Sequence, residues 1–187
     1  MSLARIERFA VRQKLTMMVN RYAVHALGPD DELGPLLAVA QQKRLAFKEQ
    51  VTFFTDDSRS TPVFSFKARQ AIDLAATYDV MDAAGQPVGL FKKDFGSSLL
   101  RSTWNLEAAG VTARGQERNA LVAVVRRVVN LPFAYHFDFH DPAGNLVLSV
   151  ERQFSLRDRY TVTVPGGRLD GRVAAAMAVG LDALQGR

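Results

Sequence analysis

Hydrophobic and polar residues alternate with a period of two through most of the chain, which predicts half-buried β-strands. The alternation recurs about every ten residues, and turn-forming residues at 82–85 and 141–144 separate neighbouring segments. About a dozen such segments favour a meander closed into a barrel or a sandwich. The predicted strands are 9–15, 22–26, 36–42, 51–54, 62–68, 76–81, 88–92, 104–107, 111–118, 133–139, 146–151 and 160–164.

Residues 169–184 break this pattern and predict a C-terminal helix, in which Asp170 is either the N-cap or an acid of the first turn. Alanine and glycine fill the faces between the larger apolar residues, and no charged residue lies between Arg172 and Asp182. A helix that is apolar on every side must be surrounded on every side. At about 1.5 Å per residue it is about 24 Å long, which is too short to span a bilayer. The sequence therefore predicts a mainly β (α+β) fold in which a β-barrel encloses a hydrophobic C-terminal helix.

A second apolar segment, residues 120–129, has no single interpretation. Its composition permits a short helix, whereas its β-branched valines permit a strand. If this segment is exposed, it offers an apolar patch beside Arg126 and Arg127 for a partner or for self-association.

Composition narrows the class of protein. The 187 residues are 48% hydrophobic and 23% charged, which is ordinary for a globular chain and predicts one domain over residues 1–187. The absence of cysteine excludes a disulfide scaffold, a thiolate zinc site and a cysteine nucleophile. Neither a signal peptide nor a membrane span is recognisable. The net charge of +5 is compatible with phosphate-rich partners, but the basic residues occur in scattered pairs.

Several segments resemble the LURP-one-related group of the tubby C-terminal-like superfamily, which is related to phospholipid scramblases. The resemblance is closest over residues 36–107. It includes the run from Gln41 to Asp56, Lys67-Ala-Arg69, Tyr78-Asp-Val80, and Gly89 followed by Ser98–Trp104. It implies a tubby-like barrel of about 12 strands around a central helix at about 169–184.

The resemblance also implies a ligand class, because tubby domains bind phosphoinositide headgroups through a Lys-x-Arg pair and neighbouring basic residues. Lys67 and Arg69 stand in the corresponding strand, where alternation turns both outward about 7 Å apart. Lys92, Lys93 and Arg101 are the further candidates from the next hairpin. Residues 70–73 depart from the strongly basic tubby pattern, so we expect weak binding of an anionic headgroup or phosphorylated ligand.

Other readings of the sequence have less support. His136, Asp138 and His140 share a strand face and superficially form a metal-binding set, but an outward polar face explains them equally, and we predict no metal and no cofactor. The second hypothesis for function is a protein-interaction or scaffold domain whose basic surface is incidental. The third is an enzyme that uses Asp138 and His140.

We predict no catalytic residues. We expect a cytoplasmic protein, peripheral at an anionic membrane, and no nucleic-acid partner. The oligomeric state is left open.

Overall fold

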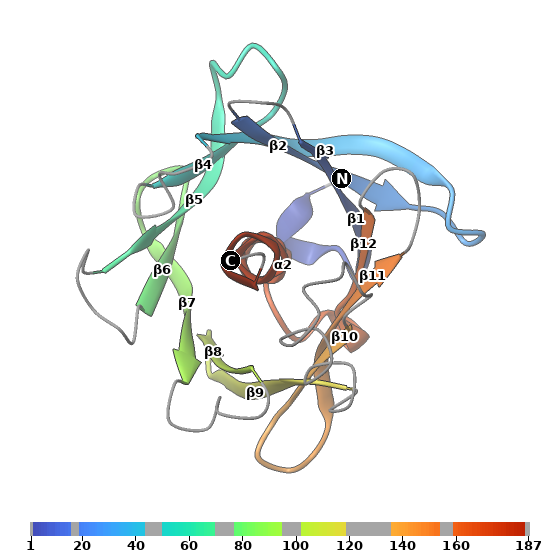
Figure 1. Cartoon of the computed structure of the whole chain (residues 1–187), viewed down its shortest axis with the longest axis vertical. Helices are drawn as coiled ribbons and strands as arrows, with labels where there is room; N and C mark the ends of the chain where they lie inside the picture. Colours follow the sequence, from blue (N-terminus) through green and yellow to red (C-terminus); the bar gives the residue numbers. More distant parts are fainter. Residues whose placement is uncertain are drawn as a thin grey trace, which may run out of the picture.

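The computed structural model of the chain is a closed antiparallel β-barrel with a helix running through its interior (Figure 1). The strands follow one another around the barrel in sequence order, and the last strand pairs with the first. The predicted fold class is therefore confirmed, with closure deciding for a barrel over a sandwich. The structure describes residues 2–15, 19–43, 50–69, 77–94, 102–118, 136–153 and 159–185.

Twelve strands form the wall in the described part of the chain. They are β1 (Arg8–Leu15), β2 (Val19–Leu27), β3 (Leu33–Lys43), β4 (Val51–Phe54), β5 (Pro62–Ala68), β6 (Thr77–Asp82), β7 (Pro87–Asp94), β8 (Thr103–Ala108), β9 (Val111–Glu117), β10 (His136–His140), β11 (Leu146–Gln153) and β12 (Arg159–Thr163). Short 3-10 turns, η1 (Leu3–Arg5) and η2 (Pro165–Gly167), precede the first strand and follow the last.

Alternation along the strands separates the core from the outer face, as the sequence predicts. In β10, Phe137 and Phe139 are 0% exposed, whereas His136 and His140 lie on the other face.

The turns that follow β6 and β10 are stabilised in the same way, by an aspartate side chain that accepts hydrogen bonds from the turn backbone. The carboxylate Oδ1 of Asp82 accepts hydrogen bonds from the backbone N–H groups of Ala84 and Gln86, at 2.9 and 2.8 Å. Asp141 accepts the equivalent pair after β10. These short aspartate turns bring consecutive strands into antiparallel register.

The helix α2 (Gly171–Gln185) lies inside the ring of strands (Figure 1). Side chains 173–179 are all 0% exposed, which confirms that the apolar segment is surrounded. Asp170 caps the helix: its Oδ1 accepts a hydrogen bond from the backbone N–H of Arg172 at 2.8 Å. The helix begins two residues after the predicted start because Asp170 is the cap, and Leu169 is buried just before it.

Aromatic rings fill the space between α2 and one side of the wall. Phe53 and Phe64 stack with their centroids 4.1 Å apart, and Tyr78 and Phe91 stack at 4.9 Å. Trp104 is 0% exposed, which confirms its predicted place in the core. Among the described residues, no helix combines the length and apolarity that a bilayer crossing requires.

Candidate functional site

Three of the five predicted site residues lie on the outer face of neighbouring strands. Lys67 and Arg69 are exposed, while Phe66 and Ala68 between and beside them are buried, so the predicted orientation of this strand is confirmed. The backbone N–H of Arg69 donates to the carbonyl oxygen of Thr77 at 2.7 Å, and Thr77 is the register partner of Lys92. Arg69 and Lys92 therefore flank Thr77 on the outer face of β5, β6 and β7.

Arg69 already has a carboxylate partner on the next strand. Its Nε and Nη2 donate to the two carboxylate oxygens of Asp79 at 2.9 and 2.6 Å. This hydrogen bonding, followed by the charge of Asp79, raises the pKa of Arg69. Asp79 also lies directly opposite Lys67 in the register of β5 and β6. The sequence analysis missed this partner, because only the register shows which acid on β6 faces the Lys-x-Arg pair.

The other two predicted residues do not join this group in the structure. Lys93 is two residues from the buried Phe91 and therefore lies on the same, inward face of β7. Its Nζ lies 5.8 Å from the centroid of the Trp104 ring. Consecutive strand residues point to opposite faces, so Lys92 and Lys93 cannot contribute to the same outer surface. Arg101 lies outside the described residues, as does the apolar segment 120–129 that the sequence offers as a partner surface.

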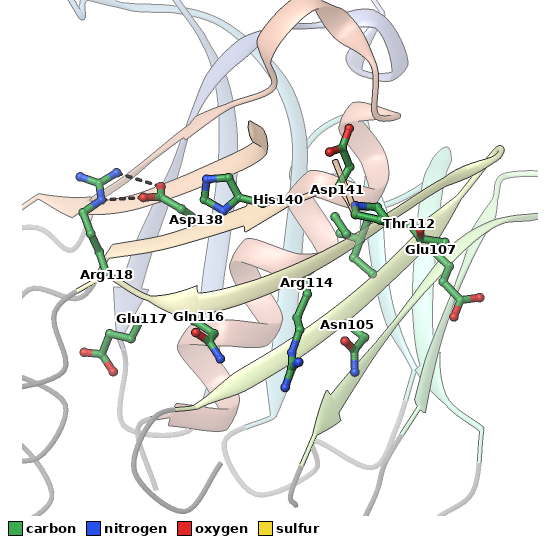
Figure 2. Close-up of a pocket in the computed structure, with 13 residues that line it drawn as sticks. Asn105, Glu107, Thr112, Arg114, Gln116, Glu117, Arg118, Asp138, His140 and Asp141 are labelled. Carbon is green, nitrogen blue, oxygen red and sulfur yellow. Dashed lines mark hydrogen bonds and ion pairs between the residues drawn. The ribbon is translucent and has the colours of Figure 1, made fainter. Parts of the chain in front are cut away.

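A shallow hollow of about 740 Å³ lies on the outer face of β8, β9 and β10 (Figure 2). Figure 2 shows Asn105, Arg114 and Gln116 projecting from the neighbouring strands on one side of it. Several charged groups that line it form ion pairs with partners of opposite charge. Arg114 donates to Asp94 at 3.3 Å, and Arg168 donates to Asp141 at 2.9 Å. Because Arg114 and Arg118 are already in ion pairs and four acidic residues line the hollow, it offers an anion less than the outer face of β5–β7 does.

Arg118 forms the densest ionic network beside the hollow. Its Nε and Nη2 donate to the carboxylate of Asp138 at 2.7 and 2.8 Å, and Nη2 also donates to Glu151 at 3.0 Å. The hydrogen bonds from Arg118 are the main cause that lowers the pKa of Asp138, against the effect of its partial burial. The same bonds raise the pKa of Arg118. This arrangement stabilises three neighbouring strands across the outer face.

His136, Asp138 and His140 do share the outer face of β10, as their spacing predicts. However, both oxygens of Asp138 accept hydrogen bonds from Arg118, so this carboxylate is engaged in the network rather than turned toward the histidines. In the part of the chain that the structure describes, no three histidine, aspartate or glutamate side chains are grouped closely enough to hold a metal ion.

Comparison with known families agrees with this architecture. The sequence profile described as LURP-one-related matches residues 37–182. The chain belongs to the LURP-one-related family. The match extends from β3 almost to the end of α2, and so includes most of the wall together with the interior helix. The predicted family is thereby confirmed. A search of the curated proteins found no relative that matches the chain. Family membership accounts for the barrel and leaves the ligand to be argued from the surface.

Proposed function

We propose that this LURP-one-related barrel is a binding domain without catalytic activity. It holds an anionic phospholipid headgroup or a phosphorylated ligand weakly on the outer face of β5–β7. The observation that carries the proposal is the placement of Arg69 and Lys92 on either side of Thr77. Two cations and a hydroxyl in one row across three strands are the donors that a phosphate group accepts from. Lys67 extends the same surface by one row.

The charges on this face support weak rather than tight binding. Lys67, Arg69 and Lys92 provide three cations, and Asp79 neutralises part of that charge through its ion pair with Arg69. The side chain of Arg69 is 56% exposed, so water and salt screen its interaction with a ligand. We therefore expect a binding constant that depends strongly on ionic strength.

The cellular setting belongs to the same proposal. The absence of cysteine, and so of disulfides, from all 187 residues is compatible with a reducing compartment, and it supports a cytoplasmic location. A basic outer face supports peripheral attachment to a membrane that carries anionic lipid, since such membranes attract clustered Lys and Arg.

Sedimentation with lipid vesicles tests the proposal. Neutral phosphatidylcholine vesicles are compared with vesicles that also contain a phosphoinositide, at an ionic strength of about 0.01 M and again at about 0.15 M. We expect binding to the phosphoinositide vesicles alone, and loss of binding at the higher salt. Each cation near an anionic surface is worth about 1 kcal/mol, so Lys67→Gln/Lys92→Gln should weaken binding about 30-fold.

The matched control removes two cations elsewhere. Arg5 and Arg59 are exposed residues of η1 and of the turn between β4 and β5, at the opposite end of the strands from Lys67, Arg69 and Lys92. Arg5→Gln/Arg59→Asn changes the net charge equally and should leave binding unchanged. Asparagine is chosen at position 59 because that residue has a positive φ of 55°. Equal pelleting of wild-type protein with both kinds of vesicle would refute the proposed function.

A further inference from the structure

Among the residues that the structure describes, acidic residues gather at one end of the barrel and basic residues along the strands toward the other. The short connections 28–32, 55–61, 83–86, 109–110 and 141–145 all lie at one end, which we call the turn end. Residues at or next to this end hold ten carboxylates and five arginines; they are 2–8, 28–32, 55–61, 82–87, 107–112, 140–146 and 164–172. The remaining described residues, along the strands and at the opposite end, hold twelve Lys and Arg and six Asp and Glu. We call that opposite end the basic end.

The dipole of the interior helix runs opposite to this separation of charge. It begins at the turn end, where Asp170 caps it, and runs toward the basic end. The positive N-terminal end of its dipole therefore faces the acidic turns, and its negative C-terminal end faces the cations. Wall and helix charges thus complement each other along the barrel axis.

Like charges face each other on the wall formed by β12, β1 and β2. Lys14 lies directly opposite Arg21 across β1 and β2. Arg12 lies opposite Arg159 in the register of β1 and β12, and Nη2 of Arg159 donates to the backbone carbonyl of Asp31 at 2.7 Å. Arg12, Lys14 and Arg21 form no ion pair with any carboxylate that the structure describes. Like charges directly opposite each other destabilise a sheet, and an external anion would offset that repulsion.

Most other arginines that the structure describes have a carboxylate partner that neutralises their charge. Arg8, Arg69, Arg114, Arg118, Arg168 and Arg172 are each in an ion pair. The side chains beside the uncompensated cations are neutral: Ala23 is the register partner of Arg12, and Gln41 is the register partner of Arg21. The wall of β1 and β2 is therefore a second basic surface, separate from that of Lys67 and Lys92.

These two basic surfaces lie on opposite sides of α2. Figure 1 shows β1 and β12 across the helix from β6 and β7. Lys14 and Arg21 lie near the ends of β1 and β2 at the basic end, and Lys92 lies near the end of β7 at that same end. A small anion reaches only one wall. A flat anionic surface wider than the barrel reaches both walls only when the barrel stands on its basic end.

We propose that the protein docks end-on on an anionic lipid bilayer, with the barrel axis along the membrane normal. Lys14 and Arg21 anchor one wall, and Lys67 and Lys92 anchor the other. The acidic turn end points away from the membrane, because anionic lipid repels it. This inference rests on the proposed function and adds to it a second anchor and a fixed orientation.

Vesicle binding of paired variants tests the second anchor. The probes are phosphatidylcholine vesicles with and without phosphatidylserine, and the proteins are wild type, Lys14→Gln/Arg21→Gln, Lys67→Gln/Lys92→Gln and the Arg5→Gln/Arg59→Asn control. Two cations near an anionic surface correspond to about a 30-fold change, so each of the two anchor variants should bind about 30-fold more weakly than the control. If Lys14→Gln/Arg21→Gln binds as the control does, the end-on inference is wrong and the single-wall function stands. If wild-type protein does not distinguish these vesicles, the end-on inference is wrong, and the comparison of neutral with phosphoinositide vesicles decides whether the single-wall function stands.

A soluble headgroup separates a bilayer from a free ligand. Titration calorimetry with inositol trisphosphate should show weaker binding for Lys67→Gln/Lys92→Gln and unchanged binding for Lys14→Gln/Arg21→Gln, because a small anion contacts one wall. Equal loss in both variants would mean that one free ligand uses all four residues, and the end-on inference would fail.

Single-cysteine labelling tests the orientation directly, because the chain contains no cysteine of its own. Gln50 and Ser58 are both exposed; Gln50 precedes β4 at the basic end, and Ser58 lies in the turn after β4 at the turn end. A fluorophore on Gln50→Cys should be quenched by a headgroup quencher in anionic vesicles, and one on Ser58→Cys should not. Equal quenching at the two positions would indicate side-on attachment and overturn the proposal.

Discussion

At the scale of single residues, the polar groups inside the barrel are as informative as those outside. Asp182, near the C-terminal end of α2, accepts hydrogen bonds from the hydroxyl groups of two wall tyrosines. Tyr22 donates to its Oδ2 at 3.0 Å, and Tyr160 donates to its Oδ1. Burial, followed by the negative charge of Asp182, raises the pKa of Tyr22 well above its usual range. These bonds tie the far end of the helix to β2 and β12.

The alkaline stability of the protein should report this contact. The folded-state pKa of Tyr22 is above its unfolded value of about 10, so its contribution is complete below pH 10 and is lost as the pH rises further. Tyr22→Phe should lower the free energy of unfolding at pH 7 by about 1–3 kcal/mol, because the half-buried, charged acceptor Asp182 loses a donor. It should also reduce the loss of stability between about pH 10 and 11. Urea unfolding of the wild type and the variant at about pH 7, 10 and 11 measures these free energies. If the two proteins lose the same stability between about pH 10 and 11, the prediction is wrong.

At the scale of elements, α2 depends on small residues for its fit inside the wall. A Cβ atom added at Gly180 would lie 2.9 Å from the ring of Phe91, closer than side-chain carbons approach. Both residues are buried, and Phe91 also stacks on Tyr78. The sequence shows that the helix is thin, but only the packing shows which small residue meets which aromatic ring.

Gly180→Ala separates helix propensity from packing. Propensity alone would make alanine about 1 kcal/mol more favourable in the middle of a helix. Because Phe91 occupies the space, we expect a net destabilisation of about 1–3 kcal/mol. In the background Phe91→Leu the same substitution should cost less, and a double-mutant cycle measures the difference. A stabilised single variant would show that the ring moves aside without cost.

At the scale of the whole molecule, wall and helix form one core. The inward side chains of the strands and the buried face of every turn of α2 belong to one continuous cluster of apolar contacts. Without the helix, the aromatic rings that line the wall would face water or an empty interior. Burial of this apolar surface is the main favourable contribution to folding.

A chain that ends at Gly167 tests this dependence. It keeps all twelve described strands and lacks the helix. We expect it to have no cooperative thermal transition by calorimetry, while the full chain shows one. A truncated chain that unfolds cooperatively would mean that the wall closes on itself.

The site was predictable in part. Alternation places Lys67, Arg69 and Lys92 on the outer face, and the same rule already separates Lys92 from Lys93, which the grouping of the two lysines by sequence proximity overlooked. The pairing of Arg69 with Asp79 was not predictable, because the side-chain pattern of one strand does not define its register with the next.

The sequence by itself determined the strands, the outward direction of Lys67, Arg69 and Lys92, and the interior place of the last helix. These follow from local periodicity and from the need to bury a helix that is apolar all round. Only the tertiary structure decided that Lys14 faces Arg21, that Arg69 faces Asp79, and that the acids gather at one end of the barrel. Register and closure bring together residues from different strands, and no local pattern contains that information.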